Sequence, residues 1–160
     1  MAWTVKTWQA NDLIERGLLK SKLVELKRIC EVLKIEPSFE VLIVECETLE
    51  EFHRITNRPY SIGAVYSKGV IVTQPFAVLR SKGVLEEVLV HELLHHVISI
   101  NFDLPGWIQE GLILYLTGAQ IEKLPFHHRE CLLRFMREVD HEEIDDLLAR
   151  YRRIPCFEPH

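Results

Sequence analysis

The segment VLVHELLHHVISI contains three residues whose types and spacing suit a metal site: His91, Glu92 and His95 form an H-E-x-x-H pattern. On an α-helix, His91 and His95 would lie about 40° apart around the axis and one turn apart in height, so both imidazoles can reach one cation. Glu92 would lie about 60° from His95, beside the ligand pair, where it can act as general base on a water that the cation activates. The spacing therefore predicts a metal-dependent hydrolytic site on a helix.

The alternative is a helix that carries these polar residues on a face exposed to water. The composition of the segment argues against it, because the predicted helix is apolar nearly all round. Polar side chains on a buried helix need partners, and a metal ion supplies one. The apolar positions are Val88, Leu89, Val90, Leu93, Leu94, Val97 and Ile98.

A catalytic zinc needs a third protein ligand and one open position. The metzincin pattern requires a glycine and a histidine where this chain has Ile98 and Asn101, which excludes that arrangement. His96 would lie about 100° from His95 and would have to unwind the helix to join the pair. We therefore expect His96 to contact the metal ligands without binding the metal, or to be a core or surface residue.

Glu110, in the segment PGWIQEGLILYLTG, is the better candidate for the third ligand. Two antiparallel helices joined by residues 101–106 would bring it back to about the height of His95, because the helical rises on the two sides nearly match. Gly111 would remove a side chain where these two helices crowd. Two histidines and one glutamate, with water in the fourth position, form the ligand set of a hydrolytic zinc site.

The two motifs together resemble those of the gluzincin metallopeptidases. H-E-L-L-H followed by P-G-W-I-Q-E-G-L-I-L-Y is similar to the pattern of the small peptidase MA-like domains, H-E-x-x-H and then P-x-W-x-x-E-G. Some compact members, the minigluzincins, are little more than a catalytic core. The resemblance covers residues 39–118. It implies a zincin-like α+β fold, in which a small mixed or antiparallel sheet packs on the active-site helix between mostly helical N- and C-terminal segments.

The chemistry that the resemblance implies is that of a zinc-dependent endopeptidase or aminopeptidase. His91, His95 and Glu110 match the family's ligands for one zinc ion, and Glu92 matches its general base. Metal-activated water would hydrolyse a peptide bond. The extended peptide or protein substrate would pair its backbone with an edge strand, which we expect at 70–73. Cleavage specificity, oligomeric state and the physiological metal are left open by these motifs.

Larger gluzincins also use a tyrosine or a histidine to stabilise the tetrahedral intermediate. Tyr115 lies five residues after Glu110, about 140° around the helix, which predicts a core position for it instead. The sequence does not choose among the remaining candidates. These are Tyr60, Tyr66, His127 and His128.

Periodicity and turn residues predict the elements that must position the site. Thr48 and Glu51 form a capping box at the start of a short helix. Gly69 marks the turn of a hairpin, because a tight turn there needs a positive φ. The predicted helices and strands cover residues 12–34, 39–46, 64–66, 70–73, 83–100, 107–117, 131–136 and 144–151.

The chain shows neither an internal repeat nor a linker-like segment, so one domain is expected over residues 1–160. It would consist of an N-terminal helix at 12–34, a catalytic core at 39–118 and a helical C-terminal part at 119–160.

Composition and charge exclude several classes of function. The 160 residues are 48% hydrophobic and 27% charged, which is typical of a globular domain. A net charge of −5 without a basic stripe argues against a nucleic-acid partner. No apolar run approaches the roughly 20 residues that span a bilayer, and the start has no signal pattern, so we expect a cytoplasmic protein without membrane contact. Cys30 and Cys46 are expected to be buried, reduced thiols.

Two other classes of function remain as alternatives. A metallopeptidase-like domain can be catalytically silent or latent and serve as a binding or regulatory module. A di-iron carboxylate protein would use Glu-x-x-His pairs on the long helices of a bundle. The first such pair falls on a predicted short helix between strands, which argues against that class. The three pairs are Glu50/His53, Glu92/His95 and Glu138/His141.

The C-terminal segment contains three further residues of metal-ligand type, Cys156, Glu158 and His160, in a stretch with two prolines. One hypothesis is that this tail occupies the cleft and blocks the open metal position, which would give a latent form. The alternative is a solvated chain end.

Overall fold

The computed structural model describes residues 4–139 and 143–153. Two compact units make up the chain, Met1–Val97 and Ile98–His160, and the boundary falls inside a long helix. Within the described residues the chain forms eight α-helices, a short 3-10 helix and one mixed sheet of four strands, so the predicted α+β class is confirmed. The expected single domain stays a prediction. None of the described helices is long and apolar enough to cross a membrane.

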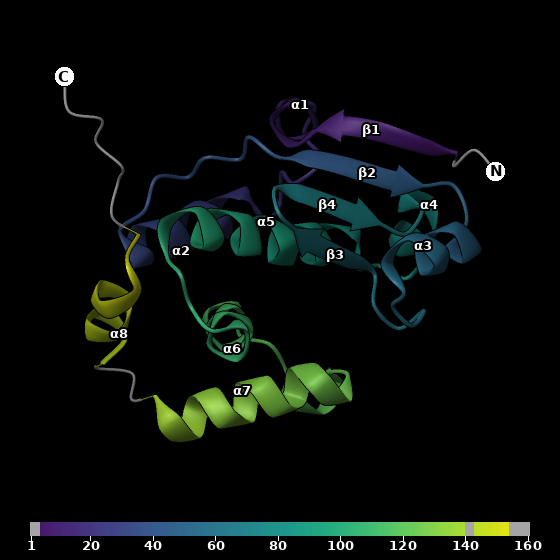
Figure 1. The fold of residues 1–160 in the computed structure, drawn as a ribbon. Coiled ribbons are helices and arrows are strands. Elements are labelled where there is room, and N and C mark those ends of the chain that lie inside the picture. Colours follow the sequence, from purple (N-terminus) through teal and green to yellow (C-terminus); the bar gives the residue numbers. More distant parts are fainter. Residues whose placement is uncertain (1–3, 140–142, 154–160) are drawn as a thin grey trace. The chain divides into compact units, whose positions relative to one another are not determined.

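The sheet of the first unit has the strand order β1-β2-β4-β3 (Figure 1). Strands β2 and β4 run parallel, and the other two neighbouring pairs are antiparallel. The edges of the sheet are therefore β1 and β3, and β4 is an interior strand. The strands are β1 (Val5–Gln9), β2 (Leu42–Cys46), β3 (Ala64–Ser67) and β4 (Val70–Thr73).

Strands β3 and β4 form the predicted hairpin, and its turn is confirmed as well. Lys68 and Gly69 both have a positive φ, 48° and 82°, as a two-residue turn that matches the twist of its strands requires. The prediction that 70–73 is an edge strand is wrong, because β4 also pairs with β2. Pro75 lies past the end of β4 as the N-cap of α4 (Phe76–Ser81), so its missing N–H interrupts no strand pairing.

The N-terminal part differs from the continuous helix predicted over 12–34. The structure has two helices there, α1 (Ala10–Glu15) and α2 (Leu23–Leu33). Gly17 lies between them with a φ of 88°, which is incompatible with a right-handed helix, and Leu19 is buried in the same connection. The sequence pattern also misses β1, because its side chains are at most half-buried and no apolar run marks it. Pairing with β2 forms that strand.

The start of α3 (Leu49–Thr56) follows the predicted capping box in part. Thr48 Oγ1 accepts the Glu51 N–H at 3.0 Å, as predicted. The Glu51 carboxylate accepts the N–H of Glu47 at 3.0 Å, one residue before the position that a reciprocal box requires. The predicted helix is thus confirmed, with its second cap bond shifted.

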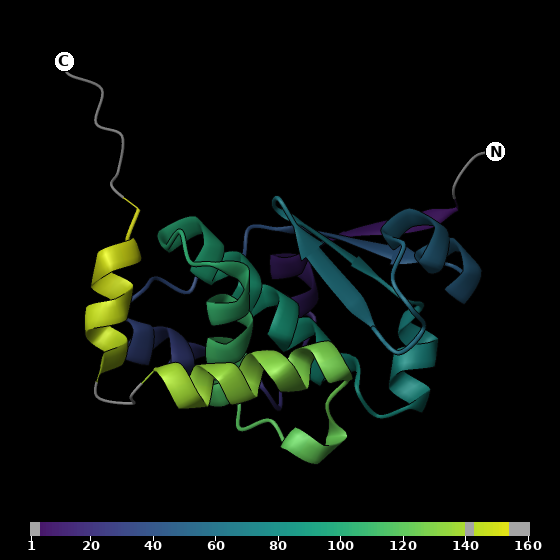
Figure 2. The same cartoon turned by 60° about the horizontal axis from the view of Figure 1, so that its bottom comes forward.

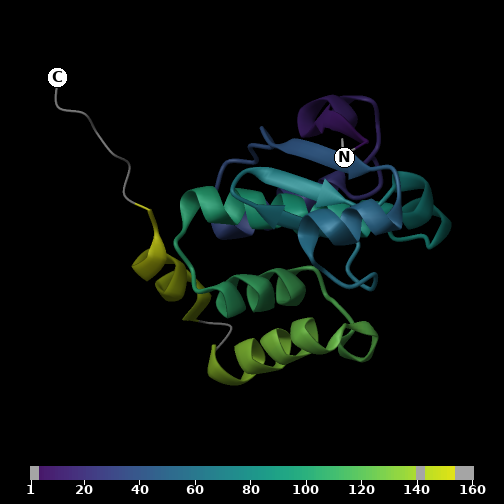
Figure 3. The ribbon, with the colours of Figure 1, turned by 45° about the vertical axis from the view of Figure 1, so that its right-hand side comes forward.

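The long helix α5 (Leu85–Asn101) confirms the helix predicted over 83–100. Its first-unit part runs along one face of the sheet (Figures 1 and 3). Leu89 and Leu93 are each only 1% exposed, so this helix belongs to the core, as its apolar composition predicts.

The second unit contains the last turn of α5 and the helices that follow it. The helices predicted there are confirmed, and α7 extends well beyond the residues predicted for it. Helices α6 and α7 run side by side (Figure 3), and η1 lies in the connection between them (Figure 2). The elements are α6 (Gly106–Leu116), the 3-10 helix η1 (Ile121–Lys123), α7 (Phe126–Glu138) and α8 (Ile144–Tyr151).

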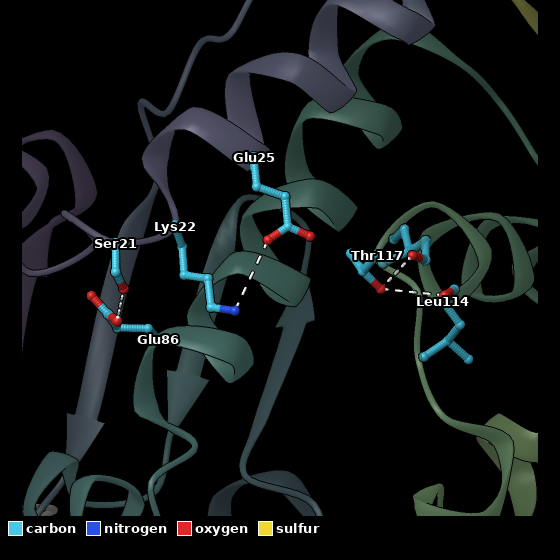
Figure 4. A network of polar contacts seen from close by, with 7 residues as sticks. Ser21, Lys22, Glu25, Glu86, Leu114 and Thr117 are labelled. Atoms are coloured by element: carbon cyan, nitrogen blue, oxygen red, sulfur yellow. Dashed lines mark hydrogen bonds and ion pairs between the residues drawn. The ribbon is translucent and has the colours of Figure 1, made fainter.

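Two groups of hydrogen bonds organise the ends of these helices. The hydroxyl of Thr117, just after α6, donates to the Ile113 carbonyl at 2.8 Å. It also lies 3.3 Å from the carbonyl oxygen of Leu114 (Figure 4). After α8, the N–H and the Nε–H of Arg153 donate to the carbonyls of Asn101 and Ser99, at 2.9 and 2.7 Å. The residues that follow α8 therefore satisfy carbonyls at the C-terminal end of α5, which no helical N–H reaches.

Candidate functional site

Helix α5 brings the three residues of the H-E-x-x-H pattern together within the first unit. The rings of His91 and His95 have centroids 5.0 Å apart and are inclined at 69° to each other. Ligand atoms of His91, Glu92 and His95 all lie within 4.8 Å of one another. The two histidines are one helical turn apart, so this convergence follows from the geometry of the helix itself.

The chemistry and burial of this cluster fit a divalent cation. Glu92 is 7% exposed, whereas His91 and His95 are half-buried. A buried carboxylate is costly unless hydrogen bonds or a positive charge accompany it. Imidazole nitrogens and carboxylate oxygens are ligands that zinc prefers. The cluster can therefore bind a metal ion through its imidazoles, and its carboxylate can accept a proton beside them.

His96 points to a different partner from its neighbour His95. It is 6% exposed, and its Nδ1 lies 3.0 Å from the hydroxyl oxygen of Tyr66 on β3. That oxygen also accepts the N–H of Gly69 at 3.1 Å. Burial lowers the pKa of His96, which favours its neutral imidazole. His96 thus joins α5 to the β3–β4 hairpin, which agrees with the supporting or core role expected for it.

Replacing Tyr66 by phenylalanine is expected to lower the free energy of unfolding by about 1–2 kcal/mol, because it leaves two part-buried polar groups without their partner. Urea unfolding measures the change. Tyr60→Phe is the matched control, since Tyr60 is 50% exposed, and it should change stability by less than about 0.5 kcal/mol. Equal stability of the two variants would show that the hydroxyl of Tyr66 contributes nothing.

The structure places Glu110 on α6 in the second unit, next to a histidine that the sequence did not single out as its partner. Glu110 is 9% exposed, and its Oε1 lies 3.2 Å from the Nε2 of His128 on the first turns of α7. His128 was one of four candidates for stabilising the intermediate. Its pairing with Glu110 depends on how α6 and α7 pack, which helical periodicity alone does not predict.

Gly111, directly after Glu110, allows this close packing. A Cβ at Gly111 would lie 2.5 Å from the Cβ of Phe135 and 2.8 Å from the carbonyl oxygen of Cys131, both on α7. The sequence correctly predicts that Gly111 lies where two helices crowd. It predicts the wrong partner, because the three atoms nearest to the added Cβ belong to α7 and not to the helix that precedes α6. The E-G dipeptide therefore indicates in the sequence that a helix packs closely beside Glu110. It does not indicate that this helix carries His128.

The other candidates for stabilising a reaction intermediate have partners of their own. Tyr115 packs its ring 5.7 Å from that of Phe135 but is only half-buried, so the core position predicted for it is confirmed in part. The ring of Tyr60 lies 5.4 Å from that of His53. His127 has its Nε2 3.7 Å from the Sγ of Cys131.

Two of the three Glu-x-x-His pairs of the di-iron alternative have other contacts. Glu50 forms an ion pair with Arg54, and Glu138 forms one with Arg134 at 3.1 Å. The Nδ1 of His53 lies 2.8 Å from the carbonyl oxygen of Arg58. His141, the partner of Glu138, lies outside the described residues.

None of the cysteines that the structure describes belongs to the cluster. Cys30, Cys46 and Cys131 are buried free thiols, which confirms the expectation for the first two. Burial raises the pKa of Cys30 and of Cys46 to about 11, so both remain protonated at neutral pH. The tail residues Cys156, Glu158 and His160 lie outside the described part of the chain.

The described residues thus supply two buried acidic groups with histidine neighbours. One is the His91/Glu92/His95 cluster of the first unit, and the other is the Glu110–His128 pair of the second. No protein-family model, curated protein or solved structure matches this chain. What the protein does must therefore be inferred from these side chains.

Proposed function

We propose that this protein is a zinc-dependent peptidase of the gluzincin type, with a zincin-like fold and α5 as its active-site helix. The observation that carries the proposal is the convergence of His91, Glu92 and His95 within 4.8 Å on one helix of the core. On a single helix, this spacing places two metal ligands and a general base side by side.

His91, His95 and Glu110 would hold one zinc ion. Support for Glu110 comes from its ligand type, its buried position on α6 and the P-G-W-I-Q-E-G context. His128, at 3.2 Å, would orient that carboxylate, as outer partners of metal ligands do. When bound, zinc would polarise the peptide carbonyl and lower the pKa of a water molecule to about 7.

Glu92 would act as the general base. Its carboxylate would take a proton from the attacking water and pass it to the leaving amine. A buried carboxylate beside two imidazoles is suited to this because its surroundings exclude bulk water, which would compete for the proton.

The substrate would be an extended peptide or protein segment. Since β4 is interior, the strand of the hairpin that lies at the edge of the sheet is β3 (Ala64–Ser67), and β3 replaces 70–73 as the strand available for backbone pairing. The net charge of −5 makes nucleic acid an unsuitable partner.

Elemental analysis of zinc-loaded, dialysed protein tests the ligand set. Wild type should retain about one zinc per chain, and His91→Ala and Glu110→Ala should each lose more than the roughly 100-fold in affinity that removal of an outer partner costs. His53→Ala is the matched control, since His53 belongs to a Glu-x-x-His pair outside the cluster, and it should keep its zinc. Full zinc content in Glu110→Ala would remove that residue from the ligand set, and a wild type that cannot be loaded would overturn the proposal.

The alternative is a metallopeptidase-like binding or regulatory domain. One observation favours it: the Tyr66 hydroxyl, a candidate for stabilising a reaction intermediate, is already hydrogen-bonded to His96 and Gly69. Such a domain would bind zinc and hydrolyse no peptide.

A further inference from the structure

A cavity of about 960 Å³ lies within the first unit, lined by β1, the α1–α2 region, α4 and the start of α5. None of His91, Glu92 and His95 lines it. Its volume is at the upper end of the range in which proteins bind small molecules. The cavity is thus a second candidate site, and it shares no residue with the His91/Glu92/His95 cluster.

Two aromatic rings form a fixed apolar surface in this cavity. Trp8 stacks on Phe76 with ring centroids 6.2 Å apart and an angle of 20° between the planes. Glu45 holds both residues: one carboxylate oxygen accepts the Trp8 indole N–H at 3.1 Å, and the other accepts the Phe76 backbone N–H at 2.8 Å. The Glu45 charge is therefore satisfied by the protein. Trp8 is half-buried and presents apolar area to a ligand, backed by Phe76, which is 8% exposed.

Basic side chains surround that apolar surface. Four of them line the cavity, Lys6, Arg16, Lys22 and Arg80, and three acidic side chains line it as well, Glu45, Glu86 and Glu87. The guanidinium of Arg16 lies 5.8 Å from the centre of the Trp8 ring, so one cation stands directly over the aromatic surface.

Some of the charged side chains that line the cavity have partners within the protein, and others form no ion pair. Lys22 faces Glu25 at 4.0 Å, and Glu86 accepts a hydrogen bond from the Ser21 hydroxyl (Figure 4). Within the part of the chain that the structure describes, Lys6, Arg16 and Arg80 form no ion pair. Cations beside an apolar surface attract an anion whose remaining part is apolar, because both portions of such a molecule then find a complementary surface.

We propose that this cavity binds a small organic anion with an apolar body and one acidic head group. The apolar body lies against Trp8 and Phe76, and Arg16 and Arg80 bind the head group.

Fluorescence titration of the full chain, treated with a chelator to remove metal, tests this with anilinonaphthalene sulfonate as the probe. Phenylnaphthylamine, which has the same rings without the sulfonate, is the matched ligand. The anionic dye should bind saturably to one site and at least about tenfold more tightly than the neutral one, the contribution of a charged hydrogen bond. Inorganic sulfate should compete only weakly, since it lacks the apolar body. Absence of saturable binding, equal affinity for both dyes, or sulfate binding as tight as that of the dye would each overturn the proposal.

Variants locate the binding site. Arg16→Gln and Arg80→Gln should each weaken binding of the anionic dye about tenfold, and neither side chain is buried, so the fold should be retained. Arg28→Gln is the matched control: Arg28 is an exposed cation on α2 that does not line the cavity, and its dye affinity should match wild type. His91→Ala should also bind as wild type, which separates this site from the metal cluster. Wild-type affinity in both cavity variants, or equal weakening in Arg28→Gln, would show that the dye binds elsewhere.

Discussion

Glu92→Gln is expected to lower peptide hydrolysis by a factor of about 10²–10⁴ while the protein still binds one zinc per chain. This range is the usual contribution of a positioned general base. Glutamine has almost the same shape as glutamate, so the buried position is filled, but its amide cannot accept the proton of the attacking water. Hydrolysis of a fluorogenic peptide library by zinc-loaded protein, with elemental analysis of the same samples, measures both quantities.

Glu31→Gln is the matched control for this substitution. Glu31 is an exposed carboxylate on α2, outside the cluster, and its loss should leave the rate within about twofold of wild type. Wild-type turnover in Glu92→Gln would remove Glu92 from the role of base. If the wild type binds zinc and hydrolyses none of the peptides, the binding or regulatory alternative is favoured instead.

Gly111→Ala is expected to destabilise the protein by about 2–3 kcal/mol, the largest stability effect that a single methyl group should have here. The added Cβ would lie 2.5 Å from the Phe135 Cβ and 2.8 Å from the Cys131 carbonyl oxygen. Neither atom is the end of a flexible side chain, so α6 and α7 must move apart. The Glu110–His128 contact of 3.2 Å links the same two helices and should loosen with them.

Gly106→Ala is the control on the same helix, because no atom lies within 4 Å of the Cβ it would add. It should leave the free energy of unfolding unchanged or raise it by up to about 1 kcal/mol, since alanine favours helix more than glycine does. Urea unfolding of both variants against wild type gives the comparison. Similar stability of the two variants would mean that the close approach of α7 to Gly111 does not affect the free energy of unfolding.

Features set by residues close together in the sequence are the ones that could be predicted. The His91/His95 convergence follows from the helical repeat, which depends only on the spacing of residues within one element. The Lys68–Gly69 turn follows from the positive φ that glycine allows, and the Thr48 cap follows from its position three residues before Glu51. In each case the interacting groups are at most four residues apart.

Contacts between residues far apart in the sequence could not be predicted without the tertiary structure. Strand β1 exists through its pairing with β2, and β4 is interior because β2 pairs with it in parallel. The predicted helix over 12–34 is divided around Gly17, whose neighbour Leu19 is buried in the connection. A pattern of apolar residues marks which positions will be buried without saying which element will bury them.

The sequence by itself determined the convergence of His91, Glu92 and His95 on α5, since helix geometry is local and the same in every context. Only the tertiary structure decided that Glu110 pairs with His128, that Gly111 packs on α7 and that Glu45 holds Trp8 and Phe76 around a cavity. These contacts join segments whose approach depends on the packing of whole elements, and no local spacing specifies that packing.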